Sequence, residues 1–324
     1  MSQLFAYITH KGGIADDTAL ELINAAKKID ADASVTAVVT GSGADLNTVC
    51  TEMAACYSEV WKIDNEAIAY PNAEAIRKAL VKILPADSIV LIPNDTLGMD
   101  LGPGLSIKMD SSFAADVVDF EGTDGSTLKL IRQEYAGQVS THVDCDISFG
   151  AVITVRPGVF RPDESKSANG QVVDKSGGAG DLSVGRKFLE IVEAEVGDID
   201  ITRSEVLLSV GRGIGDEDNI GIAQDLADAM GADLACSRPI VDAKWLEKSR
   251  QVGSTGRTVK PKVYMAMGIS GSFQHLSGIK GSPFIVAVNK NPRAPVFQVA
   301  QVGVVADILE LMPRLTEALR RESR

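Results

Sequence analysis

The last third of the chain repeats one pattern that constrains the fold: an apolar run, a glycine-rich turn and the start of a helix. The run Glu205–Val210 leads into GRGIG at residues 211–215, and the run Val263–Met267 leads into GISG at residues 268–271. Strands that alternate with helices are typical of a parallel sheet covered on both faces. Because the carboxyl ends of parallel strands meet at one edge, we expect both turns to lie at that edge.

These turns suit an anionic ligand. Glycine lets backbone N–H groups come close to an anion, and the N-terminus of the following helix carries a partial positive charge. The spacing GxGxG differs from the GxGxxG dinucleotide fingerprint, so residues 211–215 alone fit a tight turn better than a nucleotide site. A third glycine-rich segment, Val252–Thr258, precedes the second strand. Three such segments at one sheet edge favour a nucleotide-type ligand.

The composition is that of a globular protein whose field disfavours nucleic acid. Of 324 residues, 45% are hydrophobic and 23% are charged, and the net charge is −12. Basic residues gather at Lys244–Arg250 and Arg257–Lys262, which leaves a compact anionic ligand open. No apolar run reaches about 18 residues, and Met1–Ile8 fits a first β-strand better than a leader. We therefore expect a cytoplasmic protein with no direct membrane insertion.

No catalytic or metal-binding constellation is evident. The four cysteines are scattered without a CxxC pair, which indicates reduced thiols rather than a zinc or iron–sulfur site. The GISG segment is not the GxSxG nucleophile elbow, and the histidines are His10, His142 and His275. His275 is too close in sequence to Ser270 for the usual triad order. A serine hydrolase is disfavoured, and we expect no catalytic residue.

Residues 1–200 are predicted to form an N-terminal α/β domain. Strands are expected at Ser34–Val39 and Ser88–Pro93, with a helix at Ala73–Leu84. A small antiparallel addition is expected from three further segments: Leu128–Ile131, Gln138–His142 and Ala151–Pro157. The polar, glycine-containing segment Arg161–Ser183 is predicted to be a flexible connection.

Residues 201–324 are predicted to form a doubly wound, Rossmann-like domain. A helix is expected at Asn219–Met230 and another from Val304 to Arg321, kinked or divided at Pro313. The expected strands are Glu205–Val210, Asp233–Cys236, Val263–Met267, Pro283–Val288 and Pro295–Val299.

Residues 204–319 resemble the C-terminal domain of electron-transfer flavoprotein alpha subunits. The matching motifs are SVGRGIG, CSRPIVDAKW, QVGSTGRTVKPKVYMAMGISG, FQHLSGIKGS, IVAVNKNPRAPVFQVA and VGVVADILELMP. Their order and spacing both match, which is more specific than any single glycine turn. The N-terminal half resembles the family more loosely, in LIPNDTLGMDLGPGLSIKM and ITVRPGVF.

The resemblance implies a heterodimer with a beta subunit, packed on the N-terminal domain, and FAD in the C-terminal domain. It implies a carrier without substrate turnover of its own, in fatty acid β-oxidation. Electrons would come from acyl-CoA dehydrogenase-type flavoenzymes and pass to a quinone reductase or another acceptor. An alternative within the family is an electron-bifurcating complex that oxidises NADH, which would be an oxidoreductase. A free-standing nucleotide-cofactor enzyme of the same fold, or a subunit that has lost its flavin, is a further alternative.

The resemblance also implies the cofactor-binding residues. Arg238, Thr255 and His275 would surround the isoalloxazine ring, and Ser270, Asn289 and Asp307 would hold the remainder of FAD. The complete predicted set is Arg212, Ser237, Arg238, Gln251, Val252, Gly253, Ser254, Thr255, Gly256, Gly268, Ile269, Ser270, Gly271, Gln274, His275, Asn289, Lys290, Asp307 and Ile308.

Several of these residues also have a structural explanation. Arg238 could be an ion-pair partner of Asp242, His275 could line its helix, and Asp307 could be a solvated helix residue. The chain departs from many family members at Ser254, where they have glutamine, and at Gln301-Val302, where they have an Asp-Tyr pair. These departures leave the redox tuning of the flavin in question.

A charge beside the ring would matter chemically. A flavin that takes up an electron without a proton becomes anionic, so a positive or hydrogen-donating group there stabilises the reduced forms. One unit charge at about 4 Å and an effective dielectric of about 20 contributes about 4 kcal/mol, or about 170 mV for one electron. A single positive charge, from Arg238 or a protonated His275, would thus be enough to decide whether the flavin semiquinone accumulates.

Overall fold

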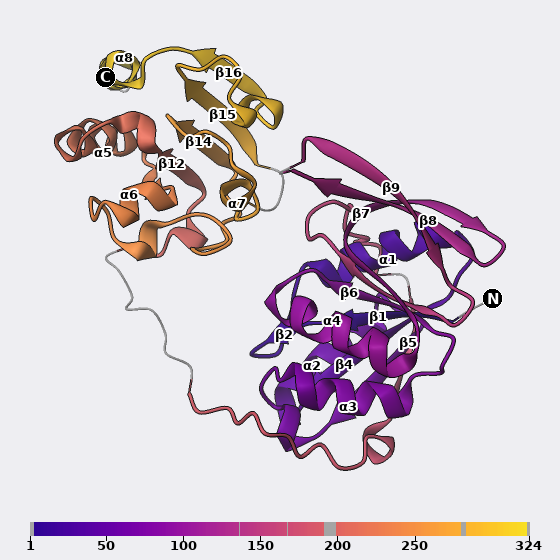
Figure 1. The fold of residues 1–324 in the computed structure, drawn as a ribbon. Coiled ribbons are helices and arrows are strands. Elements are labelled where there is room, and N and C mark those ends of the chain that lie inside the picture. The colour runs from indigo at the N-terminus through magenta and orange to yellow at the C-terminus, as the bar shows by residue number, and fades with distance from the viewer. Residues whose placement is uncertain (1–2, 136, 167, 191–198, 280–282, 323–324) are drawn as a thin grey trace. The chain divides into compact units, whose positions relative to one another are not determined.

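The computed structural model describes residues 3–135, 137–166, 168–190, 199–279 and 283–322. The chain divides into two compact units, Met1–Glu190 and Ile191–Arg324, each with its own large β-sheet (Figure 1). The predicted α/β class is confirmed. Residues 1–2 of the predicted first strand and residues 280–282 of the FQHLSGIKGS motif lie outside the described residues. Within the described ranges, no helix is both long and apolar enough to cross a bilayer.

The first unit contains a nine-stranded sheet with a parallel centre. The fully buried strands β1, β6 and β10 lie next to one another, as expected for strands covered on both faces. In spatial order the strands are β11 (Gln171–Asp174), β5 (Glu59–Asp64), β4 (Val35–Gly41), β1 (Leu4–Ile8), β6 (Ile89–Pro93), β10 (Ala151–Val155), β7 (Ser112–Asp124), β8 (Thr127–Glu134) and β9 (Val139–Asp146).

Two pairs of helices bury the two faces of this sheet. α1 (Thr18–Ile29) and α2 (Gly43–Ala54) pack on one face, and α3 (Ala73–Ile83) and α4 (Thr96–Met109) pack on the other. Asn72 caps the N-terminus of α3, because its side chain accepts hydrogen bonds from the backbone N–H groups of residues 74 and 75. A short hairpin, β2 (His10–Lys11) and β3 (Ile14–Ala15), follows β1.

The antiparallel addition consists of β7, β8 and β9 (Figure 1). Its predicted segments at residues 128–131 and 138–142 are confirmed, but the third, Ala151–Pro157, is wrong. Residues 151–155 form β10, which pairs in parallel with β6 and β7. All five residues of β10 are buried, and a short continuous apolar run of this kind fits a core strand covered on both faces.

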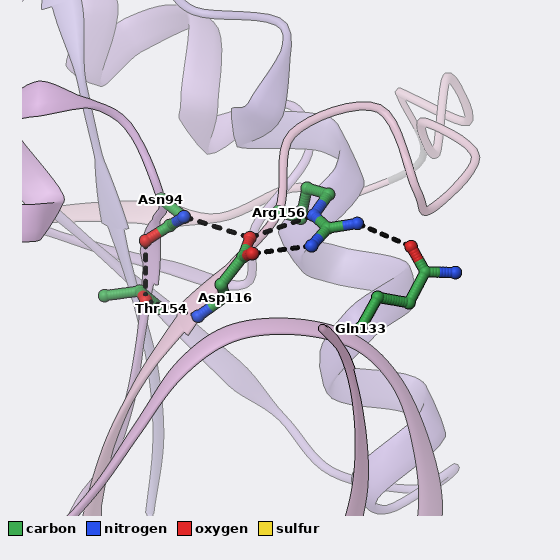
Figure 2. A network of polar contacts seen from close by, with 5 residues as sticks. All are labelled: Asn94, Asp116, Gln133, Thr154 and Arg156. Carbon is green, nitrogen blue, oxygen red and sulfur yellow. Dashed lines mark hydrogen bonds and ion pairs between the residues drawn. The ribbon is translucent and has the colours of Figure 1, made fainter. Parts of the chain in front are cut away.

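A polar network surrounds the part of β7 where its pairing changes from β10 to β8 (Figure 2). The Asp116 carboxylate accepts from the Arg156 guanidinium at 2.9 Å from Nε and 2.5 Å from Nη2. Asn94 donates to Asp116 and accepts from Thr154, and Gln133 accepts from Arg156. Asp116 has a φ of +57°, and the register of β7 against β10 shifts at this point. The network thus holds a bulge that redirects β7.

The prediction of a flexible connection at Arg161–Ser183 is wrong. Residues 171–174 form β11, which pairs in parallel with β5 at the sheet edge. Ala179 and Leu182 are buried in the core that α3 and α4 share. The polar composition concealed this, because backbone hydrogen bonds and polar contacts, which leave no apolar pattern in the sequence, attach much of the segment to the fold.

The second unit contains a five-stranded, fully parallel sheet. In spatial order its strands are β13 (Asp233–Cys236), β12 (Val206–Val210), β14 (Val263–Met267), β15 (Phe284–Asn289) and β16 (Val302–Val305). α5 (Ile220–Met230) and α8 (Ile308–Glu322) pack together on one face. Two short helices, α6 (Arg238–Asp242) and α7 (Phe273–Leu276), follow β13 and β14.

Two predictions for the end of this unit are wrong. The segment Pro295–Gln298 is a 3₁₀ turn rather than a strand. The fifth strand is β16, at Val302–Val305, so the last helix begins at Ile308 instead of 304. That helix runs through Pro313 without being divided.

Candidate cofactor site

A residue of the predicted site lies at the end of every strand in the second sheet. Arg212, Ser237 and Gly268 closely follow β12, β13 and β14. Asn289 ends β15, and Asp307 lies just after β16. Because the strands are parallel, these residues share one edge of the sheet. The chain passes from β12 to β13 on one side and from β14 to β15 on the other. The gap between β12 and β14 is therefore the switch point where open α/β sheets bind ligands.

Two glycine loops meet at this switch point. The Gly211 N–H donates to the Met267 carbonyl at 2.9 Å, and the Gly213 N–H donates to the Gly268 carbonyl at 3.1 Å. A Cβ at Gly213 would lie 2.7 Å from the Gly268 Cα, closer than such atoms can approach. Glycine at these positions is therefore required for the contact between the loops, in addition to any ligand it admits. Arg212, between them, is exposed.

The third glycine segment is fixed between β13 and α7. The Val252 N–H donates to the Cys236 carbonyl at 2.9 Å, and the Ser254 N–H donates to the Gln274 carbonyl at 2.7 Å. Gly253 has a φ of +141°, and a Cβ there would lie 2.7 Å from the Gln274 carbonyl oxygen. Within the loop, Gln251 Nε2 donates to Thr255 Oγ1 at 2.9 Å, and the Gly256 N–H donates to the Gly253 carbonyl at 2.9 Å. The loop is thus held in a defined position beside His275.

His275 is buried and neutral, so a protonated His275 as the source of the positive charge beside the ring is not supported. His275 is only 5% exposed, and its Nε2 lies 2.8 Å from the Tyr264 hydroxyl oxygen. Burial lowers the pKa of His275 to about 4, although the nearby Val252 carbonyl offsets part of that shift. At neutral pH this ring offers a hydrogen bond rather than a charge.

The depressed pKa of His275 predicts acid sensitivity. The unfolded chain takes up a proton near pH 6.5, whereas the folded chain resists protonation until about pH 4. This group's stabilisation is therefore complete above pH 6.5 and is lost as the pH falls toward 4, by up to about 3 kcal/mol. We expect urea unfolding of His275→Gln to lack this part of the wild-type pH dependence. If the free energy of unfolding changed equally with pH in both proteins between pH 4 and 6.5, the prediction would be contradicted.

Arg238 is placed to carry a charge at the site. Its side chain is 65% exposed and its Nε lies 3.3 Å from Asp242 Oδ2, so the ion pair considered as its structural explanation is present. Exposed pairs of this kind are worth at most about 1 kcal/mol, so the guanidinium can exchange Asp242 for an anionic ligand. Ser237, beside it, is buried at the end of β13.

The ends of β14, β15 and β16 are also connected. Asn289 Nδ2 donates to the Ile269 carbonyl at 2.8 Å, and the Ser270 carbonyl accepts from the Val296 N–H at 3.1 Å. Lys290 Nζ lies 2.8 Å from Asp307 Oδ2, and this contact helps to hold the pKa of Asp307 below its usual range. Among the remaining predicted positions, Gly271 has a φ of +81° against Val296, and Ile308 is buried at the start of α8.

Two buried polar residues beside the site were missed by the sequence analysis. Tyr264 is fully buried in β14, where the apolar pattern hides its hydroxyl. Arg250 is 7% exposed, and its Nη1 donates to the Leu234 carbonyl at 2.8 Å, which ties the start of the glycine loop to β13. The one available signal was an arginine directly before the QVGSTG motif.

Comparison with known protein families identifies the family of this chain. Residues 200–280 match the electron transfer flavoprotein FAD-binding domain, and residues 4–176 match the electron transfer flavoprotein domain. The chain belongs to the electron-transfer flavoprotein alpha-subunit family. The FAD-binding match over residues 200–280 includes the switch point and the three glycine segments.

Similar electron-transfer flavoproteins cover nearly the whole chain. The alpha subunit from Methylophilus methylotrophus is 36% identical over 98% of this chain and 99% of its own length. The alpha subunit from Thermoanaerobacterium thermosaccharolyticum is 28% identical, over 98% of both chains. The acryloyl-CoA reductase electron transfer subunit beta of Anaerotignum propionicum is 28% identical over 98% of this chain and 95% of its own length.

The residues at this edge of the flavoprotein fit a flavin. Among the described residues, His275 Nδ1 and Ser209 Oγ are buried without a hydrogen-bond partner of normal geometry. A buried polar atom without a partner costs about 1–3 kcal/mol, so a ligand that bonds to it is favoured. A flavin ring carries several hydrogen-bonding atoms and supplies electron transfer when bound. No cluster of three His, Cys, Asp or Glu side chains in the described ranges is arranged to hold a metal.

Proposed function

We propose that this chain is the alpha subunit of a heterodimeric electron-transfer flavoprotein and holds FAD in residues 201–324. It carries electrons from an acyl-CoA dehydrogenase-type flavoenzyme of fatty acid β-oxidation to a quinone reductase or another acceptor. It turns over no substrate of its own and acts in the cytoplasm. The observation that supports this most is the convergence of the three glycine segments and all five strand ends at one edge of the second sheet.

The predicted contact residues keep their roles within this proposal. Arg238, Thr255 and His275 lie on the loops at the β13 and β14 ends and are assigned to the flavin ring. Ser270, Asn289 and Asp307 follow β14, β15 and β16 and are assigned to the rest of FAD. This order along the sheet suits an extended dinucleotide, because the ligand can run across successive strand ends.

Exposed apolar side chains on the first unit support a protein partner. On α4, Met99 and Ile107 are 56% and 76% exposed and share one helix face with Pro103. Apolar surface of this kind is a common mark of a protein interface. The proposed occupant is the beta subunit.

The proposed partner and cofactor can be tested together. The chain should be co-expressed with the product of its genomic neighbour and purified through a tag on this chain alone. We expect a 1:1 complex, from which denaturation releases FAD that chromatography distinguishes from FMN. A soluble, monodisperse chain that ignores its neighbour would count against the obligate heterodimer, and released FMN would count against FAD.

Arg238 gives a quantitative prediction about the potential. Because its side chain is 65% exposed, solvent screens its charge, and about 1 kcal/mol at a dielectric near that of water corresponds to about 40 mV. We expect Arg238→Ala to lower the flavin midpoint potential by about that amount in a potentiometric titration. Arg320→Ala, which removes an exposed arginine from α8, is the control. If the two variants had equal flavin midpoint potentials, Arg238 would not lie close to the flavin.

One observation favours a second candidate. A relative named as an electron transfer subunit of acryloyl-CoA reductase matches nearly the whole chain. A bifurcating complex that oxidises NADH is therefore the alternative, and it predicts two flavins per heterodimer with reduction by NADH. One flavin and no reduction by NADH would exclude it.

A further inference from the structure

We propose that Tyr264 is a positioning residue that holds His275 as a neutral donor, with its proton on Nδ1. The inference rests on the proposed function in one respect, the assignment of His275 to the flavin ring. The geometry behind it lies wholly within the second unit.

The Tyr264 hydroxyl and the His275 ring form a closed buried pair. Tyr264 is 0% exposed and His275 is 5% exposed, and the oxygen lies 2.8 Å from Nε2. Tyr264 comes from β14 and His275 from α7, so the hydrogen bond fixes the helix to the strand that precedes it. Their rings are tilted at 56° with centroids 6.0 Å apart, so they are not stacked.

The direction of this hydrogen bond follows from the acceptors that are available. A phenol is a better donor than acceptor, and the His275 ring nitrogen lies within hydrogen-bonding distance of this hydroxyl with normal geometry. Ser209 Oγ lies close enough to influence the Tyr264 pKa, but it completes no hydrogen bond of normal geometry. A Tyr264 hydroxyl that donates to Nε2 forces the single proton of a neutral imidazole onto Nδ1.

The surroundings of Nδ1 suit a donor that is reserved for a ligand. Nδ1 is buried and has no partner of normal geometry, and the carbonyl of Val252 is the nearby protein group that favours a proton on the ring. The loop over the ring is packed so closely that a Cβ at Gly253 would lie 3.4 Å from the His275 Cα. A Cβ at Gly278 would lie 2.4 Å from the Gly253 nitrogen. These backbone contacts fix the loop against the helix that carries His275.

The position of the proton on His275 decides whether the ring attracts or repels an anionic atom of a ligand. A proton on Nδ1 stabilises an anionic oxygen or nitrogen through a hydrogen bond, whereas an unprotonated Nδ1 would repel it. Neutral imidazole acts in this way at other sites where the environment depresses its pKa. Tyr264 would therefore set the sign of the His275 interaction, and Arg238, at the start of α6, would supply a positive charge.

The test is the tautomer of His275 in the full chain. With only three histidines in the sequence, ¹⁵N-histidine labelling gives few signals, and His275→Gln identifies the one of interest. We expect a neutral ring at pH 7 with the proton on Nδ1, and in Tyr264→Phe a ring in which Nε2–H is populated. A wild-type ring that is cationic at pH 7, or has its proton on Nε2, would overturn the proposal. Tyr57→Phe, which removes a buried hydroxyl bonded to the Ala19 carbonyl in the first unit, should leave the His275 signals unchanged.

The flavin-loaded chain supplies the second readout. In Tyr264→Phe we expect reduced flavin to bind about tenfold more weakly relative to oxidised flavin than in wild type, which is about 59 mV for a one-electron couple. An unchanged ratio with an intact Nδ1–H tautomer would show that Tyr264 does not position His275. If wild-type protein binds no flavin, the proposed function fails, whereas the tautomer measurement still decides the proposal about Tyr264.

Discussion

Gly271→Ala is expected to destabilise the second unit by about 3 kcal/mol and to remove most flavin binding. Gly271 has a φ of +81°, which an alanine adopts only at a cost of about 1–2 kcal/mol. The new Cβ would also lie 2.2 Å from the backbone nitrogen of Val296, which cannot move as a side chain can. That nitrogen bonds to the Ser270 carbonyl, so the displacement would disturb two adjacent strand ends.

Urea unfolding monitored by tryptophan fluorescence measures this effect. The chain has two tryptophans, Trp61 in the first unit and Trp245 in the second, so a Trp61→Phe background reports the second unit alone. Gly221→Ala is the matched control, because Gly221 lies in α5 with no atom near its potential Cβ. It should be neutral or stabilising by up to about 1 kcal/mol. Similar urea concentrations at the unfolding midpoint for the two variants would contradict the close packing inferred at Gly271.

Arg156→Met is expected to destabilise the first unit by about 3 kcal/mol. The substitution leaves the Asp116 carboxylate at the β7 bulge without its guanidinium, and breaking a buried ion pair in this way is strongly destabilising. The Arg156 side chain is only 12% exposed, so water cannot take over its role fully. Urea unfolding followed by the fluorescence of Trp61, in a Trp245→Phe background, measures the stability of this unit.

Two further variants separate charge from packing in that network. Combining Arg156→Met with Asp116→Asn should recover about half of the loss, since the unpaired charge is removed while Asn still suits a φ of +57°. Lys262→Met breaks an exposed pair with Glu205 and should change stability by less than about 1 kcal/mol. If Arg156→Met were as mild as Lys262→Met, the network would not be what holds the bulge.

The sequence predicted the second unit well because its information is local. Strand, glycine turn and helix follow one another within a few residues at Val206–Gly215 and at Val263–Gly271, and the structure brings these turns to one edge. The failures arose where structure depends on distant residues. The direction of β10 depends on β6 and β7, and Asp116 and Arg156 are 40 positions apart.

The electrostatics of the site were harder to predict than its location. That Arg238 is exposed and pairs with Asp242 follows from helical spacing, and the sequence analysis considered that pair. The neutrality of His275 does not follow from its own segment, because it results from burial beneath the Val252–Gly256 loop and from Tyr264 on another strand. The contact residues themselves stay a prediction until a flavin complex is measured.

The most direct test of the central claim is the flavin content of the chain purified with its proposed partner. Absorbance between 350 and 500 nm, calibrated by the cofactor released on denaturation, gives the number of flavins per chain. The account predicts one FAD for each copy of this chain, lost in Gly271→Ala and retained in Gly221→Ala. Protein that stays free of flavin even after FAD is added would contradict it.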